Sequence, residues 1–203
     1  CVAPKALGYR FTIREGATLW EVERDLVQKG LADPGELVGM GASSEFALLN
    51  SLPSASRLPP AKYPNPLEGY LFPDTYQLPK EGAVRALVER ATGKMKRVLG
   101  SLDRESLRRP GVQDLHDLVT LASIVEREAV RVHEMPTIAS VYLNRLVKDM
   151  KLQADPTMIY APETWSQAPS PSHRRRKSNV YNTYAHSGLP PGPIGAVGQD
   201  ALS

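Results

Sequence analysis

Apolar residues recur at helical spacing in several stretches, and this pattern predicts the main elements of the chain. The clearest stripe covers Glu81–Leu102 and predicts a scaffold helix. A shorter stripe begins after Thr18, which can form a capping box with Glu21, and it ends at Gly30. Alternation over residues 8–13 predicts a strand just before this helix. The strand and the helix together suit a small α/β unit.

The stretch 117–130 (DLVTLASIVEREAV) predicts a buried, amphipathic helix that Asp114 caps. It carries Glu126 and Glu128 two positions apart, which is about 200° of helical rotation, so they lie on different faces. The side chains one and two turns before Glu128 are aliphatic: Leu121, Ile124 and Val125. Such neighbours raise the pKa of a carboxyl, as a general acid near neutral pH requires. An ordinary core helix with two glutamates at its rim gives the same pattern.

In the rest of the chain, proline, serine and aspartate residues mark where further helices are expected to begin. Short helices are predicted over residues 33–38, 43–49 and 103–109, and a longer one from Pro136 to about Leu146. The aromatic and apolar segment 67–78 suits a strand or extended chain.

The segment 53–66 (PSASRLPPAKYPNP) predicts a linker or wrapping loop, because it is rich in proline and serine. The predicted organisation is therefore an N-terminal subdomain over residues 1–52, the linker 53–66 and a second domain over residues 67–203. The predicted fold class is α+β, with a small α/β appendage followed by a mainly helical domain that has short strands.

The composition is that of an ordinary soluble globular protein. The chain has 203 residues, of which 41% are hydrophobic and 23% charged, enough for a proper core. The formal charge of +3 gives no sign of nucleic-acid binding. Cys1 is the sole cysteine, and His133-Glu134 lacks the second histidine that a zinc helix needs. We expect no metal and no organic cofactor, and no apolar run reaches the length of a membrane span.

Other segments carry candidate site residues, each with a structural alternative. Glu68 lies in an apolar segment and is either a site residue or a salt-bridged structural one. Asp155 is either a site residue or a helix N-cap. The basic run 173–177 is a solvated loop or attracts an anionic wall polymer or lipid. The segments 181–184 and 188–195 form a rigid ligand-binding loop or a well-packed return loop.

Six motifs stand in an order that resembles the endolytic murein transglycosylases, the MltG/YceG-like family. The resemblance runs from about Phe11 to the last residue, and its strength comes from the combination. The motifs are LEGYLFPDTY (67–76), LASIVEREA (121–129), ASVYLNRL (139–146), LQADPTMIYA (152–161), YNTY (181–184) and GLPPGPIGAVG (188–198).

The resemblance implies an enzyme of the bacterial cell envelope. Members of the family are inner-membrane proteins with one N-terminal anchor, and their catalytic domain lies outside the cytoplasm after a small LysM-like module, which residues 11–49 resemble. They cleave peptidoglycan glycan strands internally, between N-acetylmuramic acid and N-acetylglucosamine, and leave 1,6-anhydro-muramic ends. We therefore expect glycan strands as the partner, with peptidoglycan synthases as further candidates. The anchor and the family's C-terminal stretch are expected to lie outside these 203 residues.

The resemblance also implies roles for individual residues. The second glutamate of the family's E-x-E motif is catalytic, which corresponds to Glu128 as a single acid and then base, with Glu126 in support. Motif position suggests further substrate-binding residues: Glu68, Asn144, Gln153, Asp155, Tyr181 and Asn182. Two alternatives remain. One is a non-catalytic peptidoglycan-binding scaffold. The other is a lysozyme-like hydrolase that uses Asp155 or Glu68 as a second carboxylate.

Overall fold

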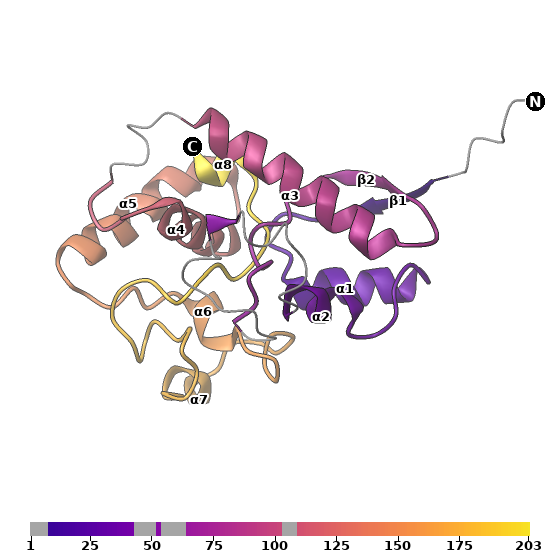
Figure 1. Cartoon of the computed structure of the whole chain (residues 1–203). Coiled ribbons are helices and arrows are strands. Elements are labelled where there is room, and N and C mark those ends of the chain that lie inside the picture. Colours follow the sequence, from indigo (N-terminus) through magenta and orange to yellow (C-terminus); the bar gives the residue numbers. More distant parts are fainter. Residues whose placement is uncertain (1–7, 43–51, 54–63, 103–108) are drawn as a thin grey trace, which may run out of the picture.

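The computed structural model of the chain describes residues 8–42, 52–53, 64–102 and 109–203. A central helix, α4, packs against α5, α6 and α8, and a small two-stranded sheet lies beside the long helix α3 (Figure 1). In chain order, the elements are β1 (Tyr9–Thr12), α1 (Leu19–Gln28), α2 (Glu36–Ala42), β2 (Thr75–Leu78), α3 (Ala83–Ser101), α4 (Leu115–Glu128), the 3₁₀ turn η3 (Val132–Glu134), α5 (Met135–Val147), α6 (Asp155–Ile159), α7 (Pro171–Arg174) and α8 (Gln199–Leu202).

The two strands come from distant parts of the sequence. β1 pairs antiparallel with β2, so that Tyr9 lies opposite Leu78 (Figure 1). The pairing continues where the N–H of Ile13 donates to the carbonyl oxygen of Asp74, 3.0 Å away. The N-terminal unit therefore closes with a strand that lies beyond its predicted end at residue 52. The boundaries at 52 and 66 stay predictions, as does the likeness to a LysM module.

One hydrophobic core joins the N-terminal and C-terminal parts. Its buried side chains run from Phe11 in β1 through Leu26 in α1 and Leu118 in α4 to Leu202 in α8. A two-stranded antiparallel sheet within a mainly helical chain fits the predicted α+β class.

The ends of α1 follow the predicted capping signals. The Thr18 hydroxyl accepts the N–H of Glu21, and the Glu21 carboxylate accepts the N–H of Thr18, which completes the capping box. Gly30, just past the helix, has a φ of 64°, the left-handed conformation that ends helices. α2 begins at Glu36, later than the predicted start. The helices predicted over 43–49 and 103–109 lie outside the described residues, apart from Arg109.

The long helix α3 has the scaffold role that its apolar stripe predicts. Its buried face includes Leu87, Ala91 and Met95, and its exposed side bears Lys94, which forms an ion pair with Asp74 just before β2. Among the described residues, no helix has both the length and the apolar character that crossing a membrane requires.

α4 is buried on all sides for most of its length, which corrects the prediction of an amphipathic helix. Every residue from His116 to Val125 is buried. The polar members of this run are satisfied internally: the His116 ring lies within hydrogen-bond distance of the Tyr70 hydroxyl, and the Ser123 hydroxyl accepts the N–H of Ile194. Beyond its first residue, the helix therefore meets solvent only in its last turn, where the two glutamates lie.

Candidate active site

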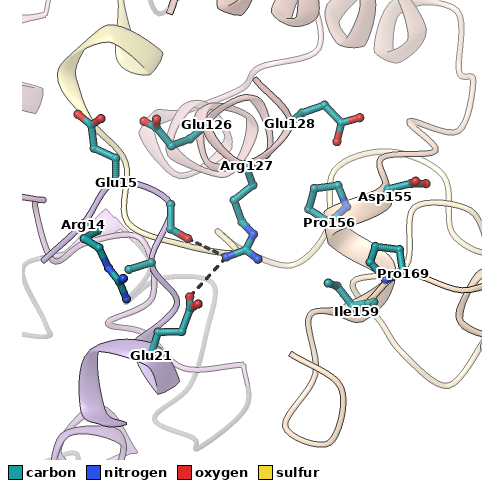
Figure 2. Close-up of a pocket in the computed structure, with 12 residues that line it drawn as sticks. Arg14, Glu15, Glu21, Glu126, Arg127, Glu128, Asp155, Pro156, Ile159 and Pro169 are labelled. Carbon is teal, nitrogen blue, oxygen red and sulfur yellow. Dashed lines mark hydrogen bonds and ion pairs between the residues drawn. The ribbon is translucent and has the colours of Figure 1, made fainter. Parts of the chain in front are cut away.

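The last turn of α4 opens into a pocket of about 650 Å³. One wall comes from the N-terminal segment 14–17 and Glu21, and the opposite wall from α6 (Figure 2). The lining residues are Arg14, Glu15, Gly16, Ala17, Glu21, Glu126, Arg127, Glu128, Asp155, Pro156, Ile159 and Pro169.

The N-terminal wall is fixed to the end of the chain by backbone hydrogen bonds. The N–H of Gly16 donates to the carbonyl oxygen of Ala196, and the N–H of Ala196 donates to that of Ala17, each at 2.8 Å. Arg127 adds a side-chain contact, because its guanidinium donates to the Gly16 carbonyl at 2.7 Å and lies 3.6 Å from the Glu21 carboxylate. The predicted appendage therefore forms part of the pocket.

Glu126 and Glu128 leave α4 in different directions, as their spacing predicts (Figure 2). Glu126 lies on the side of Glu15, where its carboxylate accepts the N–H of Gly198 at 2.9 Å. Burial raises the pKa of Glu126, the Gly198 hydrogen bond lowers it, and the negative charges of Glu15 and Asp200 raise it again. Glu126 thus holds the C-terminal segment against the helix.

Glu128 points to the other side of the helix end, toward Asp155 (Figure 2). Burial against the pocket wall raises the pKa of Glu128, and the negative charge of Asp155 raises it further. Within the described parts of the chain, no group forms a hydrogen bond or ion pair with this carboxyl. The raised pKa is common to both glutamates, so the distinguishing feature of Glu128 is a carboxyl that is open to a ligand.

Asp155 is held in the pocket by side chains from other segments. The N-cap of α6 is Ala154, so the alternative of Asp155 as N-cap is wrong. Its carboxylate instead accepts the Tyr184 hydroxyl at 2.5 Å and lies 3.5 Å from the Arg174 guanidinium. Asp155 on α6 and Glu128 at the end of α4 both line this pocket.

Glu68 lies inside the domain and not on the pocket wall. Its side chain is buried, with 3% of the residue exposed, and its carboxylate accepts the N–H of Leu19 at 3.0 Å and the Tyr160 hydroxyl at 2.6 Å. Burial raises the pKa of Glu68 to about 7, although both hydrogen bonds lower it. The structural alternative of the sequence analysis therefore fits Glu68, with an α1 N-terminus as its partner in place of a salt bridge.

Tyr181 and Asn182 are also internal. Tyr181 packs against Tyr160, with ring centroids 4.5 Å apart. The Asn182 amide donates to the carbonyl oxygens of His173, Arg174 and Arg176. The segment 181–184 is therefore chiefly the packed return loop of the two alternatives.

Asn144 and Gln153 are exposed but lie outside the pocket lining. Gln153 has a φ of 54°, and its N–H donates to the carbonyl oxygen of Thr183. Of the predicted substrate-binding residues, the structure brings Asp155 alone into the pocket with Glu128.

Sequence reasoning missed Arg127, which lines the pocket, and Arg174 and Tyr184, which contact the pocket residue Asp155. Tyr184 is part of the YNTY motif and is its one partly exposed residue, because Tyr181, Asn182 and Thr183 are all buried. The contacts of Arg127 and Arg174 are long-range and leave no local signal. Among the described residues, no three His, Cys, Asp or Glu side chains form a group that could hold a metal ion.

Comparisons with known proteins agree with the family that the six motifs suggest. The sequence profile of the YceG-like family matches residues 3–203. A protein of Bacillus subtilis (strain 168) named endolytic murein transglycosylase is 33% identical over 149 residues, which cover 68% of this chain and 38% of that protein. A protein of the same name from Streptococcus pneumoniae (strain ATCC BAA-255 / R6) is 33% identical over 140 residues, covering 67% of this chain and 25% of that protein.

A solved structure extends the agreement to the fold. The crystal structure of the yceG-like protein lmo1499 from Listeria monocytogenes matches 99% of this chain and 65% of that chain, with a TM-score of 0.78 and 29% identity. The chain thus spans 38% of the Bacillus relative's length and 25% of the Streptococcus relative's length. A profile match over nearly the whole sequence, together with these relatives, shows that the chain belongs to the YceG-like family.

Proposed function

We propose that this domain is an endolytic lytic transglycosylase that cleaves the glycan strands of peptidoglycan and leaves 1,6-anhydro-muramic ends. The observation that carries the proposal is the Glu128 carboxyl. It lies open in the pocket, faces Asp155 and has a raised pKa. The names of the Bacillus and Streptococcus relatives support the choice of substrate and reaction class.

In the first step, protonated Glu128 donates its proton to the glycosidic oxygen as the bond from that oxygen to C1 of muramic acid breaks. A raised pKa suits this step, because more of the carboxyl then holds a proton near neutral pH. In the second step, the Glu128 carboxylate takes the proton of the C6 hydroxyl while that oxygen bonds to C1. The carboxyl regains its proton, and no water is consumed.

The charge of the pocket suits this reaction. Acidic side chains on the wall outnumber the basic ones even without Glu126 and Glu128, since Glu15, Glu21 and Asp155 face Arg14 and Arg127. Positive charge develops on the sugar ring when the bond to C1 breaks, so a fixed surplus of negative charge lowers the barrier.

Other residues have supporting roles in this proposal. Asn144 and Gln153, both exposed, are candidate contacts for sugars farther along the strand. Glu68, Tyr181 and Asn182 support the pocket from inside. A glycan-strand substrate implies a location in the bacterial cell envelope. An inner-membrane anchor outside these residues and peptidoglycan synthases as partners remain expectations.

Replacement of Glu128 tests the assignment. We expect Glu128→Gln to reduce the release of anhydro-muropeptides from purified peptidoglycan by about 100-fold or more, measured by mass spectrometry, because general acid catalysis contributes that much. The matched control is Glu126→Gln, whose amide oxygen can still accept the Gly198 N–H, so that activity is largely kept. Normal release by Glu128→Gln, or loss confined to Glu126→Gln, would contradict the proposal.

A hydrolase is the second candidate, because two carboxylates, Glu128 and Asp155, share the pocket. A water-using mechanism with Asp155 as base or nucleophile would give reducing muramic ends. Mass spectrometry distinguishes the two, since an anhydro end is lighter by one water. Binding of strands by the unaltered protein without any new ends would instead support the non-catalytic scaffold.

A further inference from the structure

Asp155 is held from two sides by residues that the proposed reaction does not itself use. The Tyr184 hydroxyl donates to its Oδ1 atom at 2.5 Å, and a guanidinium nitrogen of Arg174 lies 3.5 Å from the same oxygen. The Arg174 guanidinium also lies over the Tyr184 ring, 4.9 Å from its centroid. The three side chains therefore form one contiguous unit, which we name the Asp155 clamp.

A buried amide fixes the backbone on both sides of this clamp. The Asn182 Nδ2 donates to the carbonyl oxygens of His173, Arg174 and Arg176 at 3.0–3.1 Å. Its Oδ1 accepts the N–H of Tyr184 at 3.1 Å. Asn182 has no exposed surface, so both arms of the clamp are set before any ligand arrives.

The clamp presents Asp155 to Glu128. The charged and titratable groups around Glu128 are Asp155 on α6, Tyr142 on α5, Tyr184 on the return loop, Arg145 farther along α5, and Glu126 and Arg127 on its own helix. Glu126 is bonded to the C-terminal segment and Arg127 to the N-terminal one. Asp155 is therefore the acidic group that acts on Glu128 from across the pocket.

We propose that Arg174 and Tyr184, set by Asn182, are positioning residues that hold Asp155 as a fixed carboxylate facing the catalytic Glu128. This inference rests on the proposed function of Glu128. The Asp155 anion favours the protonated form of Glu128, and Arg174 offsets part of that anion's charge. The strength with which Glu128 keeps its proton is thus set by the balance between Asp155 and Arg174. Arg174 belongs to the basic run 173–177, which thereby gains a contact with a pocket carboxylate in place of a purely solvated role.

Replacing Arg174 and replacing Asp155 should move the pH profile of the reaction rate in opposite directions. The rate of anhydro-end release falls as the general acid loses its proton at higher pH. Arg174→Gln leaves Asp155 uncompensated, so we expect this limb to move to higher pH. Asp155→Asn removes the anion, so we expect the limb to move to lower pH. Each shift should be about half a pH unit, as for one neighbouring charge in a solvated pocket.

Tyr184→Phe keeps the ring under Arg174 but removes the hydroxyl that donates to Asp155, and we expect a smaller shift to higher pH. Arg175→Gln is the matched control, since Arg175 is the next residue, is exposed and has no role in the clamp. Its profile should match that of the unaltered protein.

An NMR titration of the Glu128 side-chain carboxyl in the same variants decides the inference independently of turnover. Opposite shifts for Arg174→Gln and Asp155→Asn support the clamp, even if the products prove to be reducing ends. An unmoved Glu128 titration, with rates lowered equally at every pH, would overturn the clamp while leaving the transglycosylase proposal intact.

Discussion

Glu68 should make the stability of the folded protein depend on pH, and Glu68→Gln should remove this dependence. The carboxyl lies between the N–H of Leu19, at the start of α1, and the Tyr160 hydroxyl. Burial is the main cause that raises its pKa to about 7, while the two hydrogen bonds and the charge of Arg127 lower it in part. A site that binds a proton tightly only when folded couples folding to pH.

The sign and the size follow from the two pKa values. In the unfolded chain the Glu68 pKa is near 4.5, so the folded state binds the proton more tightly. The free energy of unfolding therefore falls as pH rises from about 4.5 to about 7, and above that range this contribution is constant. At about 1.4 kcal/mol for each tenfold change in proton affinity, the whole decrease is about 3 kcal/mol.

Urea unfolding of both proteins at about pH 5 and about pH 8 measures this contribution. Between these values the unaltered protein should lose about 2.5 kcal/mol relative to Glu68→Gln, because other carboxyls titrate equally in both. At the lower pH the variant should be the less stable by about 1–3 kcal/mol, since its amide satisfies the two donors poorly. The exposed Glu81→Gln should follow the unaltered protein. A constant difference between the unaltered protein and Glu68→Gln at every pH would refute the reasoning.

Two further exchanges test the N-terminal wall of the pocket and the start of α1. A Cβ at Gly195 would lie 2.6 Å from the Gly16 carbonyl oxygen, so Gly195→Ala should lower the free energy of unfolding by about 1–3 kcal/mol and slow anhydro-end release. The control is Gly93→Ala in α3, where a Cβ meets open space, and it should be neutral or slightly stabilising in thermal unfolding. Thr18→Ala removes the hydroxyl that accepts the Glu21 N–H and should cost about 1 kcal/mol in urea unfolding; an unchanged midpoint would show that the capping box adds nothing.

Local signals in the sequence predicted the elements well where the physical cause is local. The capping box of Thr18 and Glu21 and the cap at Asp114 depend on neighbours a few residues away, and both are confirmed. The direction of the Glu128 pKa also agrees with the prediction, with burial as the larger cause and the charge of Asp155 on α6 as the second.

Long-range contacts could not be predicted in this way. The polar residues Glu68 and Asn182 suggested ligand contacts, but both are buried. Glu68 accepts the N–H of Leu19, far away in sequence, and Asn182 donates to carbonyl oxygens of the preceding loop, including that of Arg174. The periodic pattern of apolar residues in a strand or helix predicts which side chains are buried. It does not identify the hydrogen-bond partner without which a polar group could not be buried. The pairing of β1 with β2 was hidden for the same reason, since their separation in the chain leaves no periodic trace.

The pairing of Gly16 with Ala196 has a consequence for the order of assembly. The pocket wall is built from the first described segment of the chain and from residues just before α8. During synthesis these contacts cannot form until residues 196–198 have left the ribosome, and closing so long a loop costs entropy that local helices do not. The acid on α4 therefore gains its complete surroundings only when nearly all of these 203 residues are present, so an incomplete chain carries Glu128 without an assembled pocket around it.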